Sequence, residues 1–207
     1  MKTHNYAIGV CLGASSVSFV KANIEAGKIR ITDSLNYPHH GNPKKVFAEK
    51  LEEINEDEVP VIVTGRKFRN IVNLQTISEP EATEYAYDFL TGSSQKHSAI
   101  ASLGGETFVV YTLEDGGKIS GVITKNQCAS GTGEFFLQQI KRMDLTVDEV
   151  VEIARDARPF KVSGRCSVFC KSDCTHALNK GIPAAEVASG LSQMMADKVR
   201  ELLKKVD

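Results

Sequence analysis

The stretch Lys125-Asn-Gln-Cys128-Ala-Ser-Gly-Thr-Gly133-Glu-Phe-Phe136 joins an apolar, β-branched run to a run with helical periodicity. Gly131 and Gly133 flank Thr132 at the point where the backbone must turn sharply, which glycine does at little steric cost. Backbone N–H groups at the start of a helix attract anions, because they lack helical partners and lie at the positive end of the helix dipole. We therefore predict a phosphate cradle at Gly131, Thr132 and Gly133, with Cys128 at its mouth.

A second cysteine stretch, Ser163-Gly-Arg-Cys166-Ser-Val-Phe-Cys170-Lys-Ser-Asp-Cys174, follows further along the chain. The odd total of five cysteines, with three of them in this stretch, favours metal ligands over disulfides. An iron–sulfur cluster and a zinc ion can each bind four thiolates. The C-x₂-C spacing of ordinary zinc sites is absent, which favours the cluster. Cys170 and Cys174 fall on the same helix face as Cys166. We predict that they pack as small apolar side chains, with ligation as the alternative.

The composition excludes several classes of partner. The 207 residues carry 25 basic and 26 acidic side chains, and this balance gives no electrostatic case for nucleic acid or for an anionic membrane. No apolar run approaches the roughly 20 residues of a membrane span, and the N-terminus lacks a long apolar signal core. We expect a cytoplasmic protein of one or two domains.

The first half of the chain begins with three strand-like runs at 6–12, 17–23 and 28–34. The turn between the first two contains Gly13, Ser15 and Ser16, which we predict to bind phosphate; a plain hairpin turn is the alternative. A buried strand at 59–64 leads into Gly65-Arg-Lys-Phe-Arg69, whose cations either face a ligand or are solvated. Residues 37–42, which include His39 and His40, are predicted to form an exposed loop, and metal binding by the two histidines is the alternative.

The second half repeats the order of the first. Strand-like runs at 98–103, 107–113 and 118–124 are separated by a glycine turn and a hairpin, and Gly104 and Gly105 occupy the turn. Both glycines are predicted to allow close approach of the backbone to phosphate. The repeat predicts an α/β protein with two halves, 1–93 and 94–207.

The segments CASGTGEF and GRCSVFCKSD resemble the two cysteine segments of the ATP-dependent activators of 2-hydroxyacyl-CoA dehydratases. These activators belong to the BadF/BadG/BcrA/BcrD ATPase family, and the resemblance covers nearly the whole chain. It implies the actin-like ATPase fold of two RNase-H-like halves that bind ATP or ADP with Mg²⁺. It also implies a homodimer in which Cys128 and Cys166 of both subunits hold one [4Fe-4S] cluster, which passes an electron to a dehydratase partner.

Glu79 falls near the family's acidic residue that precedes the second domain. The resemblance implies that its carboxylate positions the attacking water. The alternative is an ordinary glutamate at a helix N-terminus, which the helix dipole favours. We prefer that alternative for the neighbouring Glu81.

Both phosphate turns depart from the family patterns G-[IV]-D-[VL]-G-S-T and D-I-G-G-Q-D. Cys11 and Ser102 stand where those patterns have aspartates, so any Mg²⁺ and water must be held differently. Large fused activators resemble this chain in their opening residues. Cys11 itself is predicted to be a structural residue within a strand. A nucleotide-binding or assembly module without hydrolysis, and a small-molecule kinase, remain alternative functions.

The predicted last helix, 183–206, is followed in the family by a loop resembling G-G-[VI]-A-x-N that holds the adenosine. The sequence ends at Asp207. We therefore expect the N-terminal part of a larger fused activator, with the second half lacking its last strands.

Overall fold

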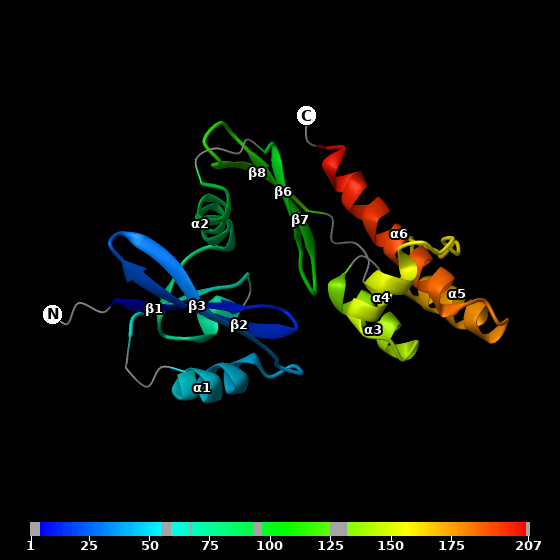
Figure 1. The fold of residues 1–207 in the computed structure, drawn as a ribbon, viewed down its shortest axis with the longest axis horizontal. Helices are drawn as coiled ribbons and strands as arrows, with labels where there is room; N and C mark the ends of the chain where they lie inside the picture. Colours follow the sequence, from blue (N-terminus) through cyan, green and yellow to red (C-terminus); the bar gives the residue numbers. More distant parts are fainter. Residues whose placement is uncertain (1–4, 55–58, 67, 93–96, 125–131, 206–207) are drawn as a thin grey trace. The chain divides into compact units, whose positions relative to one another are not determined.

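The structure is a computed structural model that describes residues 5–54, 59–66, 68–92, 97–124 and 132–205. The chain divides into two compact units, Met1–Gln95 and Lys96–Asp207, and each is described by itself (Figure 1).

The first unit is built on a five-stranded mixed sheet in the order β3-β2-β1-β4-β5. Antiparallel pairs join β1 to β2 and β2 to β3, whereas β4 is parallel to both β1 and β5. The strands span Tyr6–Leu12, Ser16–Glu25, Lys28–Pro38, Val61–Thr64 and Gln75–Thr76. The short helix η1, Phe68–Ile71, lies between β4 and β5, and α2, Glu79–Thr91, follows β5.

One face of this sheet forms the first core together with helix α1, Pro43–Ile54 (Figure 1). Alternate residues of β1 and β2 point into this core, as the two-residue period of a strand requires. Phe47 of α1 stacks on Phe19 of β2, with ring centroids 6.3 Å apart. The residues buried in it are Ile8, Val10, Leu12, Val17, Phe19, Phe47, Ile54 and Val63.

The second unit opens with an antiparallel sheet in the order β6-β7-β8, formed by Ala99–Leu103, Phe108–Leu113 and Ile119–Thr124. The predicted repeat of strand, glycine turn, strand, hairpin and strand is therefore confirmed. Within residues 97–124 and 132–205 this sheet has three strands, two fewer than the sheet of the first unit.

Four helices follow and pack on one another (Figure 1): α3, Gly133–Arg142; α4, Val147–Ala154; α5, Ser167–Asn179; and α6, Ala184–Leu203. Their shared core contains Ile140, Val150 and Leu191. A Cβ atom at Gly190 would overlap the carbonyl oxygen of Phe160, so glycine allows the segment before α5 to lie directly on α6. In α3, Phe135 and Ile140 are buried, and Phe136 and Met143 pack against the same core while staying partly exposed.

In the described ranges, no helix has both the length and the apolar character needed to cross a bilayer.

Candidate functional site

The two glycine turns share one backbone geometry. The N–H group of Gly13 donates to the carbonyl oxygen of Ser16 at 3.0 Å, and that of Gly104 donates to Thr107 at 3.1 Å. A Cβ atom on either glycine would lie 3.0 Å from the same carbonyl oxygen that its N–H group binds. The internal repeat therefore extends to the atoms of the two turns predicted to bind phosphate.

The second turn is bound to the start of α3. The N–H groups of Gly133 and Glu134 donate to the carbonyl oxygens of Gly104 and Gly105, at 3.1 and 2.9 Å. A Cβ atom at Gly133 would approach the Gly104 oxygen to 3.0 Å, so glycine permits this close contact. The structure thus brings Gly104, Gly105 and Gly133 together, although their role in phosphate binding stays a prediction.

Thr132 is the N-cap of α3, and its hydroxyl oxygen accepts a hydrogen bond from the N–H group of Phe135 at 3.2 Å. The N–H groups of Gly133, Glu134 and Phe135 thus all have partners within the chain. The start of α3 therefore binds the second turn by donating hydrogen bonds to the carbonyl oxygens of that turn. Gly131 and Cys128, the other predicted members of this cradle, lie outside the described residues.

The first turn is held by a residue that sequence reasoning missed. His39, predicted to lie in an exposed loop, is only 5% exposed. Its backbone N–H group donates to the Ser15 carbonyl oxygen at 3.1 Å, and its ring Nε2 lies 3.2 Å from the Gly13 carbonyl oxygen. No hydrophobic period marks His39, and its neighbour His40 is exposed as predicted, so nothing in the local pattern signals this burial.

Cys11 and Thr64 are paired in register where β1 and β4 end side by side. A Cβ atom at Gly65 would overlap the carbonyl oxygen of Leu12, and its φ of +132° favours glycine, so the turn after β4 passes directly over the end of β1. The hydroxyl oxygen of Thr64 is buried and has no hydrogen-bond partner among the described residues. Such an orphaned oxygen marks a place where a water or a ligand is needed.

Arg66 and Glu79 meet beside this strand end. Arg66 Nε lies 2.9 Å from Glu79 Oε2, and Nη2 lies 3.0 Å from Oε1, which is a two-pronged ion pair. Arg69 donates to the carbonyl oxygen of Ile77 at 3.4 Å, whereas Lys67 lies outside the described residues. The two described cations of this turn therefore bind the segment that begins α2.

Cys11 lies in β1, as predicted, but its side chain is exposed, so it is not a packing residue. The protein around the thiol still removes part of its hydration, which raises its pKa, and the negative charge of Glu79 raises the pKa further. A thiol with a raised pKa stays neutral near pH 7. Cys11 therefore does not supply the negative charge of the aspartate that it replaces.

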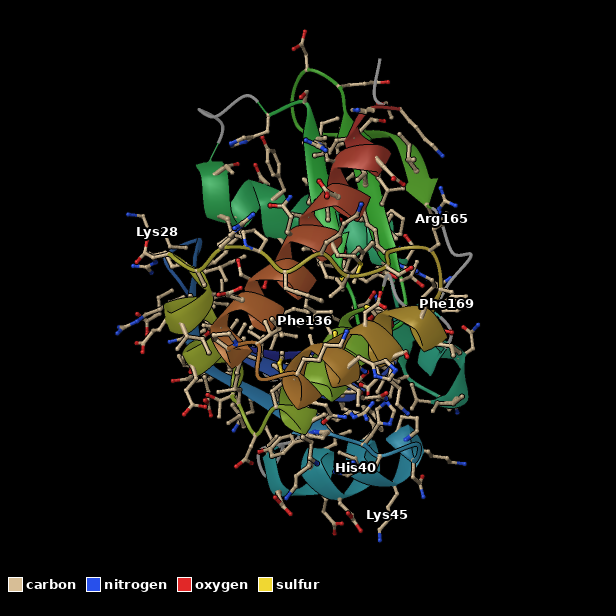
Figure 2. The ribbon with its side chains drawn as sticks, turned by 90° about the vertical axis from the view of Figure 1, so that its right-hand side faces the viewer. Lys28, His40, Lys45, Phe136, Arg165 and Phe169 are labelled. Carbon is tan, nitrogen blue, oxygen red and sulfur yellow. The ribbon has the colours of Figure 1, made fainter. Side chains whose placement is uncertain are left out.

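Cys166 is the N-cap residue of α5, with a free and partly exposed thiol. The segment before it is held by the Ser163 N–H group, which donates to Asp173 at 2.8 Å, and by Lys198 Nζ, which donates to the Gly164 carbonyl oxygen at 2.7 Å. Val168 and Phe169 just after it are 69% and 65% exposed. Figure 2 shows Phe169 and Arg165 near this end of α5.

Cys170 and Cys174 behave as predicted: both are buried in the core between the helices. The two side chains are hydrogen-bonded, and this bond together with burial raises the pKa of the Cys170 thiol. Among the described residues, no group of three or more histidine, cysteine or acidic side chains is arranged to hold a metal. A four-thiolate site would therefore need ligands beyond those that the described part of one chain supplies.

The duplicated turns and the strand order define an α/β protein with the actin-like ATPase fold. The profile of the BadF/BadG/BcrA/BcrD ATPase family matches residues 8–207, so the chain belongs to that family. A component of the benzoyl-CoA reductase of Thauera aromatica is 30% identical over 210 residues, covering 96% of this chain and 72% of that protein.

Two further comparisons match proteins named as activators. The 2-hydroxyisocaproyl-CoA dehydratase activator of Clostridioides difficile is 25% identical, over 73% of this chain and 56% of that protein. A solved structure of the Clostridium difficile activator with bound ADPNP has a TM-score of 0.83 at 21% identity, and the match covers 98% of this chain and 76% of that one. The predicted fold is therefore confirmed.

Proposed function

We propose that this protein is an ATP-dependent iron–sulfur activator that delivers an electron to a 2-hydroxyacyl-CoA dehydratase-type partner. Family membership and the names of its relatives support this function. The observation that carries it is the bond between the second turn and α3, because Cys128 precedes that helix by only five positions. A change at the nucleotide turn would thus reach the cysteine segment through two backbone hydrogen bonds.

The nucleotide would be ATP or ADP with Mg²⁺, and each unit would contribute one turn to its binding. Gly13, Ser15 and Ser16 form the first turn and Gly104 and Gly105 the second. Gly131, Thr132 and Gly133 complete the set; because the Gly133 N–H group binds Gly104 and the Thr132 hydroxyl caps α3, these two would act by holding the second turn. The relative solved with ADPNP supports a nucleotide ligand. The Glu79 carboxylate would orient the attacking water, and its ion pair with Arg66 fixes its direction.

Cys128 and Cys166 from each of two copies would hold a [4Fe-4S] cluster between subunits. Such a cluster supplies one-electron transfer at low potential. Cys166 suits this role because its thiol is free and partly exposed, and two exposed apolar side chains beside it suit a dimer contact. The positive end of α5 favours the negative charge of a thiolate-bound cluster. We further propose that the protein is a cytoplasmic homodimer.

One observation favours a second function, a nucleotide-binding or assembly module that does not hydrolyse ATP. Cys11 in the first turn and Ser102 and Thr107 in the second stand where the family patterns have aspartates, and Cys11 stays neutral near pH 7. Such a module would bind nucleotide and remain colourless.

Anaerobic purification distinguishes the two functions. The activator should be brown, with about two iron atoms per chain for a cluster shared by two subunits. Cys166→Ala should lose the iron and the dimer, whereas Cys11→Ala, which removes another accessible thiol, should keep both. Full iron retention in the Cys166→Ala protein would overturn the ligand assignment. A colourless wild-type protein that binds nucleotide would establish the second function.

A further inference from the structure

We propose that His39 is the positioning residue of the first phosphate turn, and that its neutral imidazole fixes the turn by binding the carbonyl oxygen of Gly13. The assignment of phosphate to this turn rests on the proposed function, in which Gly13, Ser15 and Ser16 bind the nucleotide. The contact between His39 and the turn belongs to the fold and can be tested without a nucleotide.

The hydrogen bonds around His39 fix its protonation. The Gly41 N–H group lies 3.0 Å from ring Nδ1, so Nδ1 must accept and carries no proton. The Gly13 carbonyl oxygen can only accept, so Nε2 at 3.2 Å must carry the proton and donate. The ring is therefore the neutral Nε2–H tautomer. A proton on Nδ1 would point at the Gly41 N–H group, so two donors would face each other and the hydrogen bond from Gly41 would be lost.

The loop after His39 is shaped to present this ring. His40 and Gly41 have φ values of +46° and +86°, and this left-handed pair brings the Gly41 N–H group back to the His39 ring. The His39 carbonyl oxygen accepts from the Asn42 N–H group at 2.8 Å. Asn42 in turn accepts hydrogen bonds from the first turn of α1. The ring is thus attached to a helix whose Phe47 is anchored in the core.

The second turn shows which groups of a phosphate turn are held by hydrogen bonds. There, backbone N–H groups of α3 bind the carbonyl oxygens of Gly104 and Gly105. A turn can present its N–H groups to an anion only when its carbonyl oxygens, which repel the anion, are held elsewhere. In the first unit the His39 ring and backbone N–H bind Gly13 and Ser15 instead. His39 is therefore the counterpart of the α3 N-terminus in the first half.

Three substitutions at His39 in the full 207-residue chain distinguish the hydrogen bond to Gly13 from the hydrogen bond to Gly41. His39→Leu removes both ring bonds. His39→Asn keeps an acceptor for the Gly41 N–H group, but the asparagine side chain is too short for its N–H group to reach the Gly13 carbonyl oxygen. His39→Gln places an amide N–H near the position of Nε2 and restores the Gly13 bond. His40→Asn is the matched control, because His40 is exposed and asparagine tolerates its positive φ.

The first readout is amide hydrogen exchange in the peptide covering residues 12–17, with no ligand present. His39→Leu and His39→Asn should exchange about tenfold faster than wild type, which corresponds to the loss of one hydrogen bond. His39→Gln should fall close to wild type, and His40→Asn should match it. Equal exchange in wild type, His39→Leu and His39→Asn would overturn the proposal.

The second readout is the ¹⁵N spectrum of the His39 ring in the wild-type protein, which needs no variant to fold. It should show the Nε2–H tautomer, and the Nδ1–H tautomer would refute the assignment. The third readout is the affinity for ADPNP with Mg²⁺, which should fall about tenfold in His39→Asn and recover in His39→Gln. If the wild type binds no nucleotide while the exchange pattern holds, the proposed function fails and the positioning role of His39 stands.

Discussion

Arg66 holds the Glu79 carboxylate by two parallel hydrogen bonds of 2.9 and 3.0 Å, across 13 positions of the sequence. The pair lies beside the end of β1, near Cys11, whose thiol is affected by the charge of Glu79. The Glu79 carboxylate is therefore close enough to act on the Cys11 thiol through its charge, and a guanidinium group fixes its direction. The first prediction tests whether this carboxylate acts in catalysis.

Glu79→Gln should lower the rate of ATP hydrolysis by at least about a hundredfold, because an amide cannot accept a proton from water. Arg66→Lys should have a smaller effect, since lysine keeps the charge but not the two-pronged geometry. The measurement is phosphate release, with nucleotide affinity followed in parallel. Glu81→Gln, in the same first helical turn, is the control and should hydrolyse ATP normally. Equal rates in the Glu79→Gln and Glu81→Gln proteins would remove Glu79 from the mechanism.

Glu79→Gln should also lower the pKa of Cys11, because a negative charge that raises it is removed. Desolvation, the larger cause, remains, so the pKa should stay above that of a free thiol. More thiolate at a fixed pH means faster alkylation by iodoacetamide. The rate is measured as a function of pH by mass spectrometry of the Cys11 peptide. An unchanged pH profile would show that the two groups do not interact.

Gly133→Ala should weaken the bond between α3 and the second turn, because the new Cβ atom would lie 3.0 Å from the Gly104 oxygen. We expect the affinity for ADPNP to fall about tenfold, which is the effect of losing one or two hydrogen bonds. Calorimetric titration measures it. Gly9→Ala is the control, since a Cβ atom there meets nothing within 4 Å. Wild-type affinity in the Gly133→Ala protein would show that nucleotide binding does not depend on this contact.

Glu149→Gln should make the stability of the protein less dependent on pH. The backbone N–H and hydroxyl groups of Thr146 donate to the Glu149 carboxylate and lower its pKa below 4.5. A lowered pKa in the folded state gives stability that is complete above 4.5 and lost as the pH falls through the folded value. Urea midpoints of the two proteins should thus differ at neutral pH and converge in acid. Glu152→Gln, at an exposed position of the same helix, is the matched control for the loss of one surface carboxylate.

The succession of strands β1 to β4 and β6 to β8 along the chain was predictable, because alternating apolar residues and glycine turns are local signals, whereas the two-residue strand β5 was not predicted. The contact of Gly104 with Gly133 was partly predictable, since both glycines stood out as turn residues. The Arg66–Glu79 pair and the burial of His39 were not, because each depends on segments that meet only after the sheet forms. Phe135 and Phe136 both pack against the helical core, and because the two side chains are equally apolar no local signal shows which is the more deeply buried.

The two turns differ in how a single mutation can damage them. The second is held by main-chain N–H groups, which almost any residue at position 134 supplies and which Gly133 supplies without crowding the turn. The first is held partly by one imidazole, which a single codon change can remove. Natural variation should therefore be tolerated unequally: relatives that lack a histidine at position 39 must fix the first turn by another side chain, whereas the second needs no such replacement.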